Sequence, residues 1–130
     1  MSPTLGNGDV CITQKINLRL KRGDIIGFNA NIRGENKSLV KRIIGLPEER
    51  VEIFPNSIVI RNSKKRIIVI EEIYLDPQVK NPETFSITLG EDEYCVLGDN
   101  RQISAGSFQF GPIHTSQIKY KFLFTLLRKF

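Results

Sequence analysis

One lysine of this chain stands inside a run of apolar residues. Lys41 lies in the segment Leu39-Val40-Lys41-Arg42-Ile43-Ile44, and Gly45 and Pro47 follow it. Val and Ile favour a pleated strand, whereas Gly and Pro mark the place where such a strand ends. Burial in a strand of this kind would remove water from the ammonium group, disfavour its charged form and lower its pKa. A neutral amine at this position could then act as a base.

The alternative is that Lys41 lies on the solvent face of an alternating strand, beside Arg42, and has no chemical role. Lysine is rarely buried without a partner, so this one segment, taken alone, favours the alternative. The two interpretations predict opposite exposures for the Lys41 side chain.

Short strands separated by turns must position this lysine. Apolar and alternating runs predict strands, and polar, glycine-containing stretches predict loops at 29–38 and 102–111. The expected strands cover residues 10–16, 25–28, 39–44, 51–54, 57–60, 66–70, 85–89, 94–97 and the first part of 118–130. Regular turn spacing over many short strands predicts an all-β fold, in which several short, coiled antiparallel sheets form one barrel-like or sandwich domain over 1–130.

Length and composition narrow the possible partners. A chain of 130 residues can bury one core without disulfides or metals, and 25% charged with 40% apolar residues is ordinary for a globular domain. No apolar run approaches the ~18 residues that a membrane span needs, so we expect none within 1–130. The net charge of +5 is spread along the chain and there is no Trp, so we expect no nucleic-acid partner.

The cysteines and the single histidine offer little catalytic chemistry. Cys11 and Cys95 match no zinc or redox spacing, so they are either buried free thiols or one long-range disulfide. His114 is the only histidine, which excludes a multi-histidine metal site and argues against a histidine-based triad. We expect no metal and no cofactor.

Three separated motifs, taken together, identify a family. They are Met1-Ser2-Pro3-Thr4-Leu5, the segment from Leu39 to Pro47, and Gly98-Asp99-Asn100-Arg101-Gln102-Ile103-Ser104, with Arg22-Gly23-Asp24-Ile25-Ile26 between the first two. Their order and spacing resemble the type I signal peptidases, which are membrane-tethered serine proteases with a Ser/Lys dyad. The resemblance covers nearly the whole chain. The short segment between Lys41 and Gly98 resembles the compact, single-anchor enzymes of Gram-positive and related bacteria.

The resemblance implies a nucleophile that the printed sequence does not contain. In the family the first motif reads Ser-Met-x-Pro-Thr-Leu and its serine is the nucleophile, whereas here the sequence begins at the methionine. Ser2 falls on the variable position of the motif, so by register it is not the nucleophile. The family's oxyanion hole and membrane anchor would also be missing. As written, the polypeptide is therefore expected not to cut signal peptides.

The remaining catalytic roles carry over from the resemblance. Lys41 matches the general base, and Ser104 matches the serine that hydrogen-bonds this lysine and orients it. Phe28, Val96 and the methylenes around Ile26 match positions that shield the lysine from water.

The resemblance also assigns supporting and substrate-binding residues. Arg42 and Asp99 match a structural ion pair next to the dyad, and Asn100 lies in the same motif. An extended signal-peptide C-region would add as a strand, and shallow pockets would admit small side chains at the first and third positions before the cut. The residues that match these pockets are Met1, Leu5, Leu39 and Val40. Met1 and Leu5 are equally compatible with plain core positions.

Three departures from the family concern the surroundings of the dyad. Gly27 replaces a bulkier residue, which predicts a thinner cover over the lysine. Glu48-Glu49 stands where Gly-Asp usually follows Leu-Pro. The third motif continues as Ser104-Ala105-Gly106-Ser107-Phe108 in place of Ser-x-Asp-Ser-Arg, so an acid/arginine pair is absent.

The function implied is that of an endopeptidase that removes signal peptides on the outer side of the cytoplasmic membrane. Its partners would be signal-peptide C-regions of exported preproteins and the lipid bilayer surface, on which the last apolar and basic residues of the chain could rest. A second hypothesis is a catalytically dead relative that binds extended peptides as an assembly or chaperone-like factor. A third, an SOS-repressor-type autoprotease, lacks the Gly-Asp-Asn-Arg motif seen here.

Overall fold

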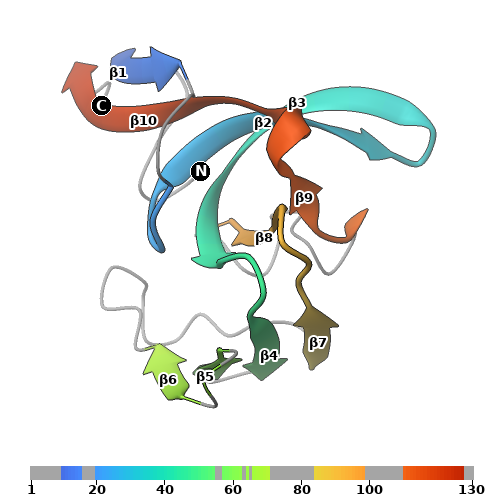
Figure 1. Ribbon diagram of the computed structural model, residues 1–130. Helices are drawn as coiled ribbons and strands as arrows, with labels where there is room; N and C mark the ends of the chain where they lie inside the picture. Colours follow the sequence, from blue (N-terminus) through green and yellow to red (C-terminus); the bar gives the residue numbers. More distant parts are fainter. Residues whose placement is uncertain are drawn as a thin grey trace.

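Strands make up almost all of the regular structure in the computed structural model (Figure 1). The structure describes residues 10–15, 20–54, 57–62, 64, 66–70, 84–98 and 110–127, and for 10–15, 70 and 123–127 it describes the backbone alone. The elements are β1 (Val10–Lys15), β2 (Ile25–Ile32), β3 (Glu35–Gly45), β4 (Arg50–Phe54), β5 (Ser57–Arg61), β6 (Ile67–Ile70), β7 (Phe85–Thr88), β8 (Glu93–Leu97), β9 (Ile113–His114), the 3-10 helix η1 (Thr115–Gln117) and β10 (Ile118–Leu127).

These strands form two antiparallel sheets. The larger has the order β1-β10-β2-β3-β8-β9, and the smaller, in the lower part of Figure 1, has the order β6-β5-β4-β7. The expected all-β fold of short antiparallel sheets is confirmed. Within the described ranges, no helix is long and apolar enough to cross a membrane.

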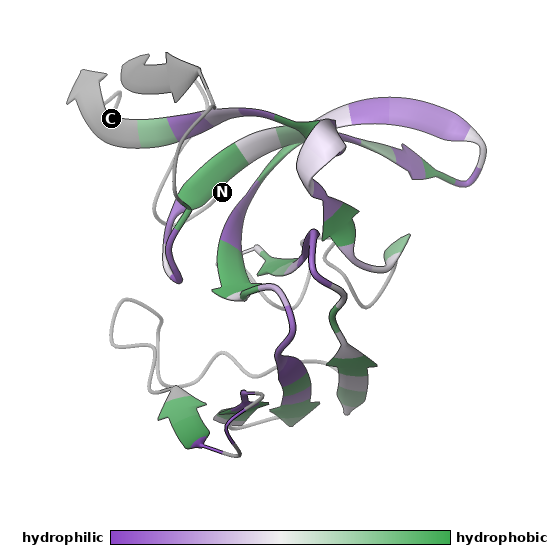
Figure 2. Ribbon diagram, viewed as in Figure 1, coloured by the Kyte–Doolittle hydropathy of each residue, from purple (hydrophilic) through white to green (hydrophobic). Residues whose placement is uncertain are grey.

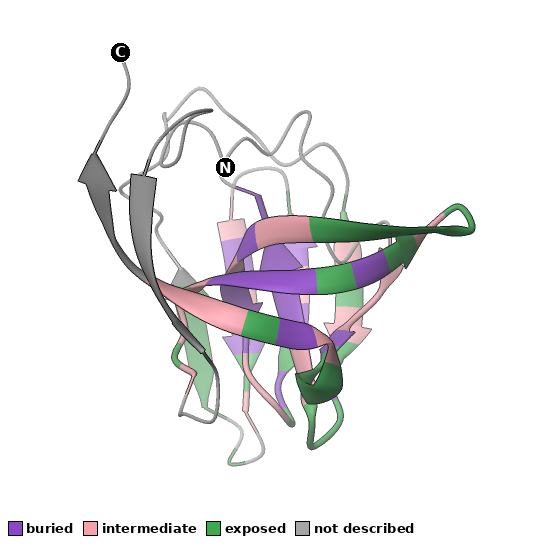
Figure 3. Cartoon of the chain, turned by 90° about the horizontal axis from the view of Figure 1, so that it is seen from above, coloured by how far each residue is buried: buried purple, intermediate pink, exposed green. Residues whose placement is uncertain are grey.

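Two apolar cores share the strands β3 and β8. Side chains alternate between the two faces of a strand, so neighbouring residues of β3 can be buried in different clusters. Ile43 of β3 and Val96 of β8 belong to the cluster under β2, whereas Ile44 and Leu97 belong to the cluster that covers the smaller sheet. Figure 3 shows the buried residues in the middle of the molecule and exposed residues at the far end of the β2–β3 hairpin. The central part of β3 is therefore covered on both faces.

The stretch 29–38, expected to be a loop, is instead the outer half of the β2–β3 hairpin. The two strands pair without interruption from Ile25↔Arg42 to Ile32↔Glu35. Arg33 and Gly34 both have positive φ, 53° and 84°, as the two central residues of a type I′ turn do. The loop prediction was wrong because polar residues in a solvated hairpin resemble loop residues in composition.

Cys95 is buried in the cluster that covers the smaller sheet, whereas the side chain of Cys11 lies outside what the structure describes, so the choice between two buried thiols and one disulfide stays open. The strand expected over the first part of 118–130 extends as β10 to Leu127, and β1 pairs with β10 from Tyr120 to Leu127.

Candidate active site

The strand β3 buries Lys41 in the centre of the larger sheet. Lys41 lies directly opposite Ile26 of β2 and is 8% exposed. The alternative in which this lysine lies on a solvent face is therefore wrong. Lys37, four residues earlier on the same face of β3, is exposed and lies 3.8 Å from Glu35. Burial thus distinguishes Lys41 from its neighbour on the same strand.

An apolar wall surrounds this lysine on its face of the sheet. Ile26 is fully buried opposite Lys41, and Phe28, 1% exposed, is on the same face of β2. Val96 of β8 lies opposite Ile43, two residues along β3 from Lys41 and therefore on the same face. The residues expected to shield the lysine thus form one cluster. Tyr94 packs against this cluster, and burial raises the pKa of its phenol.

Gly27 does not thin this wall, contrary to expectation. It lies between Ile26 and Phe28, so its missing side chain would project from the other face of β2. Gly27 pairs with Tyr120 of β10, and a Cβ atom on Gly27 would overlap the Tyr120 ring. The glycine makes room for this ring, which covers the sheet on the side away from the lysine.

The turn before β2 attaches to the end of β3 by backbone hydrogen bonds. The Gly23 N–H donates to the Ile43 carbonyl at 2.8 Å, and the Ile43 N–H donates to the Asp24 carbonyl at 2.8 Å. The Arg42 guanidinium donates to the Gly23 carbonyl at 2.8 Å. Asp24 in turn lies 3.3 Å from the ammonium of Lys121 on β10. The Arg22-Gly23-Asp24 motif thus fixes the strand that carries Lys41.

A bidentate ion pair also joins the turn before β2 to the segment after β3. The Arg22 guanidinium donates to both carboxylate oxygens of Glu49, at 2.7 and 2.8 Å, and also to the Ile44 carbonyl at 2.9 Å. Glu49 is 7% exposed and accepts the Leu46 N–H as well, at 2.7 Å. Sequence reasoning missed this pair because its partners are 27 residues apart. The one available signal was the acidic residue two positions after Pro47.

The Glu48-Glu49 departure has a structural explanation. Glu48 has a φ of 68°, a left-handed conformation that favours glycine, which is the residue usual in the family at this position. Glu49 occupies the position of the family's aspartate and makes the ion pair with Arg22. The acidic function is therefore retained, whereas the conformational freedom of the glycine is lost.

The third motif begins beside Lys41. Leu97 at the end of β8 pairs with Arg42, and the next residue, Gly98, is buried. Because β3 and β8 are antiparallel, the chain leaves β8 next to the lysine. Asp99, Asn100 and Ser104 lie outside the described residues, so their expected roles stay predictions.

The residues expected to bind substrate fall on both faces of β3. Leu39 shares the face of Lys41, lies opposite Phe28 and packs against the same cluster. Val40 projects from the other face, opposite Gly27, and is half-buried. Met1 and Leu5 lie outside the described residues.

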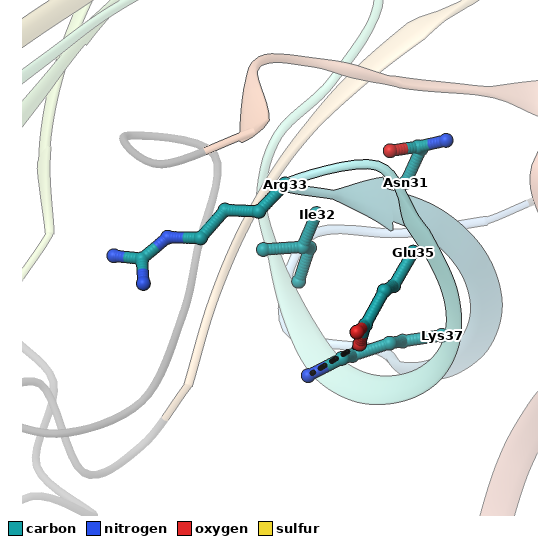
Figure 4. A pocket seen from close by; sticks show the side chains of 5 residues that line it. All are labelled: Asn31, Ile32, Arg33, Glu35 and Lys37. Carbon is teal, nitrogen blue, oxygen red and sulfur yellow. Dashed lines mark ion pairs between the residues drawn. The ribbon is translucent and has the colours of Figure 1, made fainter.

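Two other polar groups lie apart from the lysine. A hollow at the tip of the β2–β3 hairpin is lined by Asn31, Ile32, Arg33, Glu35 and Lys37. In Figure 4 its charged residues are long surface side chains, with one ion pair between Glu35 and Lys37. His114 is exposed beside the carboxylates of Asp92 and Glu93, at 3.7 and 3.4 Å. Neither group shares the apolar wall around Lys41.

The sequence profile of the family described as signal peptidase, peptidase S26, matches residues 1–127. The chain therefore belongs to the signal peptidase family, whose members are serine peptidases that cleave signal peptides.

Individual relatives agree with this assignment. The chain is 32% identical over 144 residues to signal peptidase IB of Staphylococcus aureus strain Mu50, a match that covers 95% of this chain and 71% of the relative. It is 33% identical over 121 residues to a probable signal peptidase I-2 of Synechocystis, covering 85% of this chain and 51% of the relative. The structure resembles that of a signal peptidase I from Enterococcus faecalis V583, with a TM-score of 0.62, 26% identity, and coverage of 78% of this chain and 94% of that one.

Proposed function

We propose that residues 1–130 form the catalytic domain of a membrane-associated endopeptidase that removes signal peptides from exported preproteins, with Lys41 as the general base of a Ser/Lys dyad. The observation that carries this proposal is the burial of Lys41 against the apolar wall of Ile26, Phe28 and Val96. Desolvation favours the neutral amine over the ammonium. A serine hydroxyl is a poor nucleophile until a neighbouring base takes its proton, and a neutral amine can do so without histidine.

The nucleophile in this proposal is a serine placed directly before Met1, at the first position of the family's motif. Ser104 hydrogen-bonds the Lys41 amine and orients it towards that hydroxyl. The exit of the chain from β8 beside Lys41 supports this role, because the segment that contains Ser104 starts there. Asp99 pairs with Arg42 and holds the loop, with Asn100 next to it, and neither transfers a proton.

The reaction then has two halves. Lys41 takes the proton of the serine hydroxyl, the serine oxygen bonds to the scissile carbonyl carbon, and the peptide C–N bond breaks as the lysine returns the proton to the leaving amine. In the second half, Lys41 takes a proton from water, whose oxygen bonds to the acyl carbon, and the lysine returns that proton to the serine oxygen as the acyl C–O bond breaks. The same amine therefore serves as base and acid in each half.

The substrate in this proposal is the extended C-region of a signal peptide. It adds as a strand beside β3, where Leu39 and Val40, together with Met1 and Leu5, line pockets that admit small side chains. The enzyme works on the outer side of the cytoplasmic membrane, at the bilayer surface.

Precursor processing tests the role of the lysine. The chain is produced with a serine before Met1 and an N-terminal membrane anchor, and cleavage of a secretory precursor is timed. Lys41→Ala and Lys41→Arg should each lower the rate by at least about 1,000-fold, because dyad members act as a unit and arginine stays charged. Lys37→Ala, which removes an exposed lysine on the same face of β3, should leave the rate unchanged.

The variant Ser104→Ala tests the residue that orients the base. Ser104→Ala should lower the rate less than Lys41→Ala, because Ser104 orients the base and does not carry the proton. Equal losses for the two variants would contradict this division of roles. Comparable cleavage by the Lys41→Ala protein would refute the proposed base. If the serine-bearing, anchored protein binds precursors without cutting them, the peptide-binding alternative replaces the protease.

A further inference from the structure

A cross-strand row of the larger sheet places a second lysine near Lys41. Lys41 of β3 and Lys121 of β10 both lie directly opposite Ile26 of β2, so the three side chains share one face of the sheet. The two lysines are two strand spacings apart, which is roughly 10 Å between their Cα atoms. In Figure 2 the first half of β2, which lies between β10 and β3, is largely hydrophobic. Ile26 is fully buried, so an apolar side chain and not water separates the two lysines.

The carboxylate of Asp24 pairs with this second lysine. Asp24 lies two residues before Ile26, and its backbone carbonyl accepts the N–H of Ile43, two residues after Lys41. Its side chain lies 3.3 Å from the ammonium of Lys121. The Lys121 and Asp24 side chains are 22% and 18% exposed, so solvent screens their charges only in part. A negative and a positive charge therefore lie side by side near the buried lysine.

Other titratable groups around this face, within the described part of the chain, add little net charge. Tyr94 of β8 stays neutral at neutral pH, because burial raises the pKa of its phenol. Lys37 of β3 is exposed and lies 3.8 Å from Glu35. In the turn before β2, the charge of Arg22 is balanced by that of Glu49. The pair between β10 and the start of β2 is therefore the one whose balance matters most for the buried lysine.

An unpaired carboxylate at this place would work against a general base. A negative charge favours the protonated form of a nearby amine, whereas a positive charge favours the neutral form. We propose that Lys121 neutralises Asp24, so that the charge of Asp24 does not favour the ammonium form of Lys41. Lys121 and Asp24 are then positioning residues, which act through Lys41 and transfer no proton themselves. This inference rests on the proposed function, in which Lys41 is the base.

Titration of Lys41 by NMR in the 130-residue chain tests the proposal, with the lysine signal assigned by its loss in Lys41→Arg. Lys121→Met should raise the pH at which Lys41 loses its proton by about 0.5–1 unit, because Asp24 is left unpaired. Asp24→Asn should lower this pH by a similar amount, because Lys121 is left unpaired. The double variant should restore the original value, and Lys121→Arg, which keeps the charge, should not change it. The matched control is Lys119→Met, which removes an exposed charge from the same strand and should leave the value unchanged.

The direction of the two shifts separates an effect of charge from damage to the fold. A loosened structure would admit water to Lys41 in both single variants and move the titration the same way in each, so shifts in one direction, or no shift, would overturn the inference. In the anchored protein with a serine before Met1, the acid limb of the kcat/KM profile should move with the titration, up for Lys121→Met and down for Asp24→Asn. Comparable cleavage by Lys41→Ala would refute the proposed base, whereas opposite shifts in the NMR titration would still establish the coupling between the pair and Lys41.

Discussion

At the scale of single residues, Glu48 has a backbone conformation that favours glycine. Its φ of 68° lies in the left-handed region, which costs an L-residue about 1–2 kcal/mol, while its N–H donates to the Gly90 carbonyl at 3.0 Å. Its side chain is exposed, so its removal exposes no core. The strained conformation persists because the ion pair of the next residue, Glu49, holds the turn.

Replacement of this residue tests the strain. Glu48→Gly should raise the free energy of unfolding by about 0.5–1 kcal/mol, since glycine adopts positive φ without the steric penalty. The gain is smaller than the full penalty because glycine also increases the conformational entropy of the unfolded chain. Urea denaturation measures the change. Glu48→Ala removes the same carboxylate but keeps a Cβ, so it should give no gain. A gain of equal size for alanine would show that the charge and not the conformation is responsible.

At the scale of elements, the Arg22–Glu49 pair joins the turn before β2 to the segment after β3. Glu49→Gln should lower the free energy of unfolding by about 2–4 kcal/mol, because the nearly buried carboxylate makes two bonds to Arg22 and one to the Leu46 N–H. The matched control is Glu52→Gln, which breaks the exposed pair with Arg61 and should cost less than about 1 kcal/mol. Equal costs for the two variants, measured by chemical denaturation, would show that burial adds nothing to the pair.

At the scale of the whole molecule, the two cores should unfold together because β3 and β8 contribute to both. Ile53 is 1% exposed on β4 in the cluster that covers the smaller sheet. Ile53→Ala should cost about 2–5 kcal/mol and lower amide-exchange protection equally in both sheets, although Ile53 belongs to a different cluster from the wall around Lys41. Ser86→Ala, an exposed change on β7, should leave protection unchanged. Loss of protection in the smaller sheet alone would mean that the sheets unfold independently.

The sequence by itself determined the strand content, the positions of most strands and the membership of one family. It did so because alternation, turn residues and the three motifs are local signals. Local composition wrongly predicted a loop at 29–38, because the strands of a solvated hairpin have the polar residues of a loop. It also wrongly predicted a thinner cover over Lys41 at Gly27, because only the sheet determines the face from which a side chain at position 27 would project. Only the tertiary structure decided whether Lys41 is buried and which carboxylate pairs with Arg22. Each of these depends on strand register and on contacts between residues distant in sequence, and no single segment of the chain carries that information.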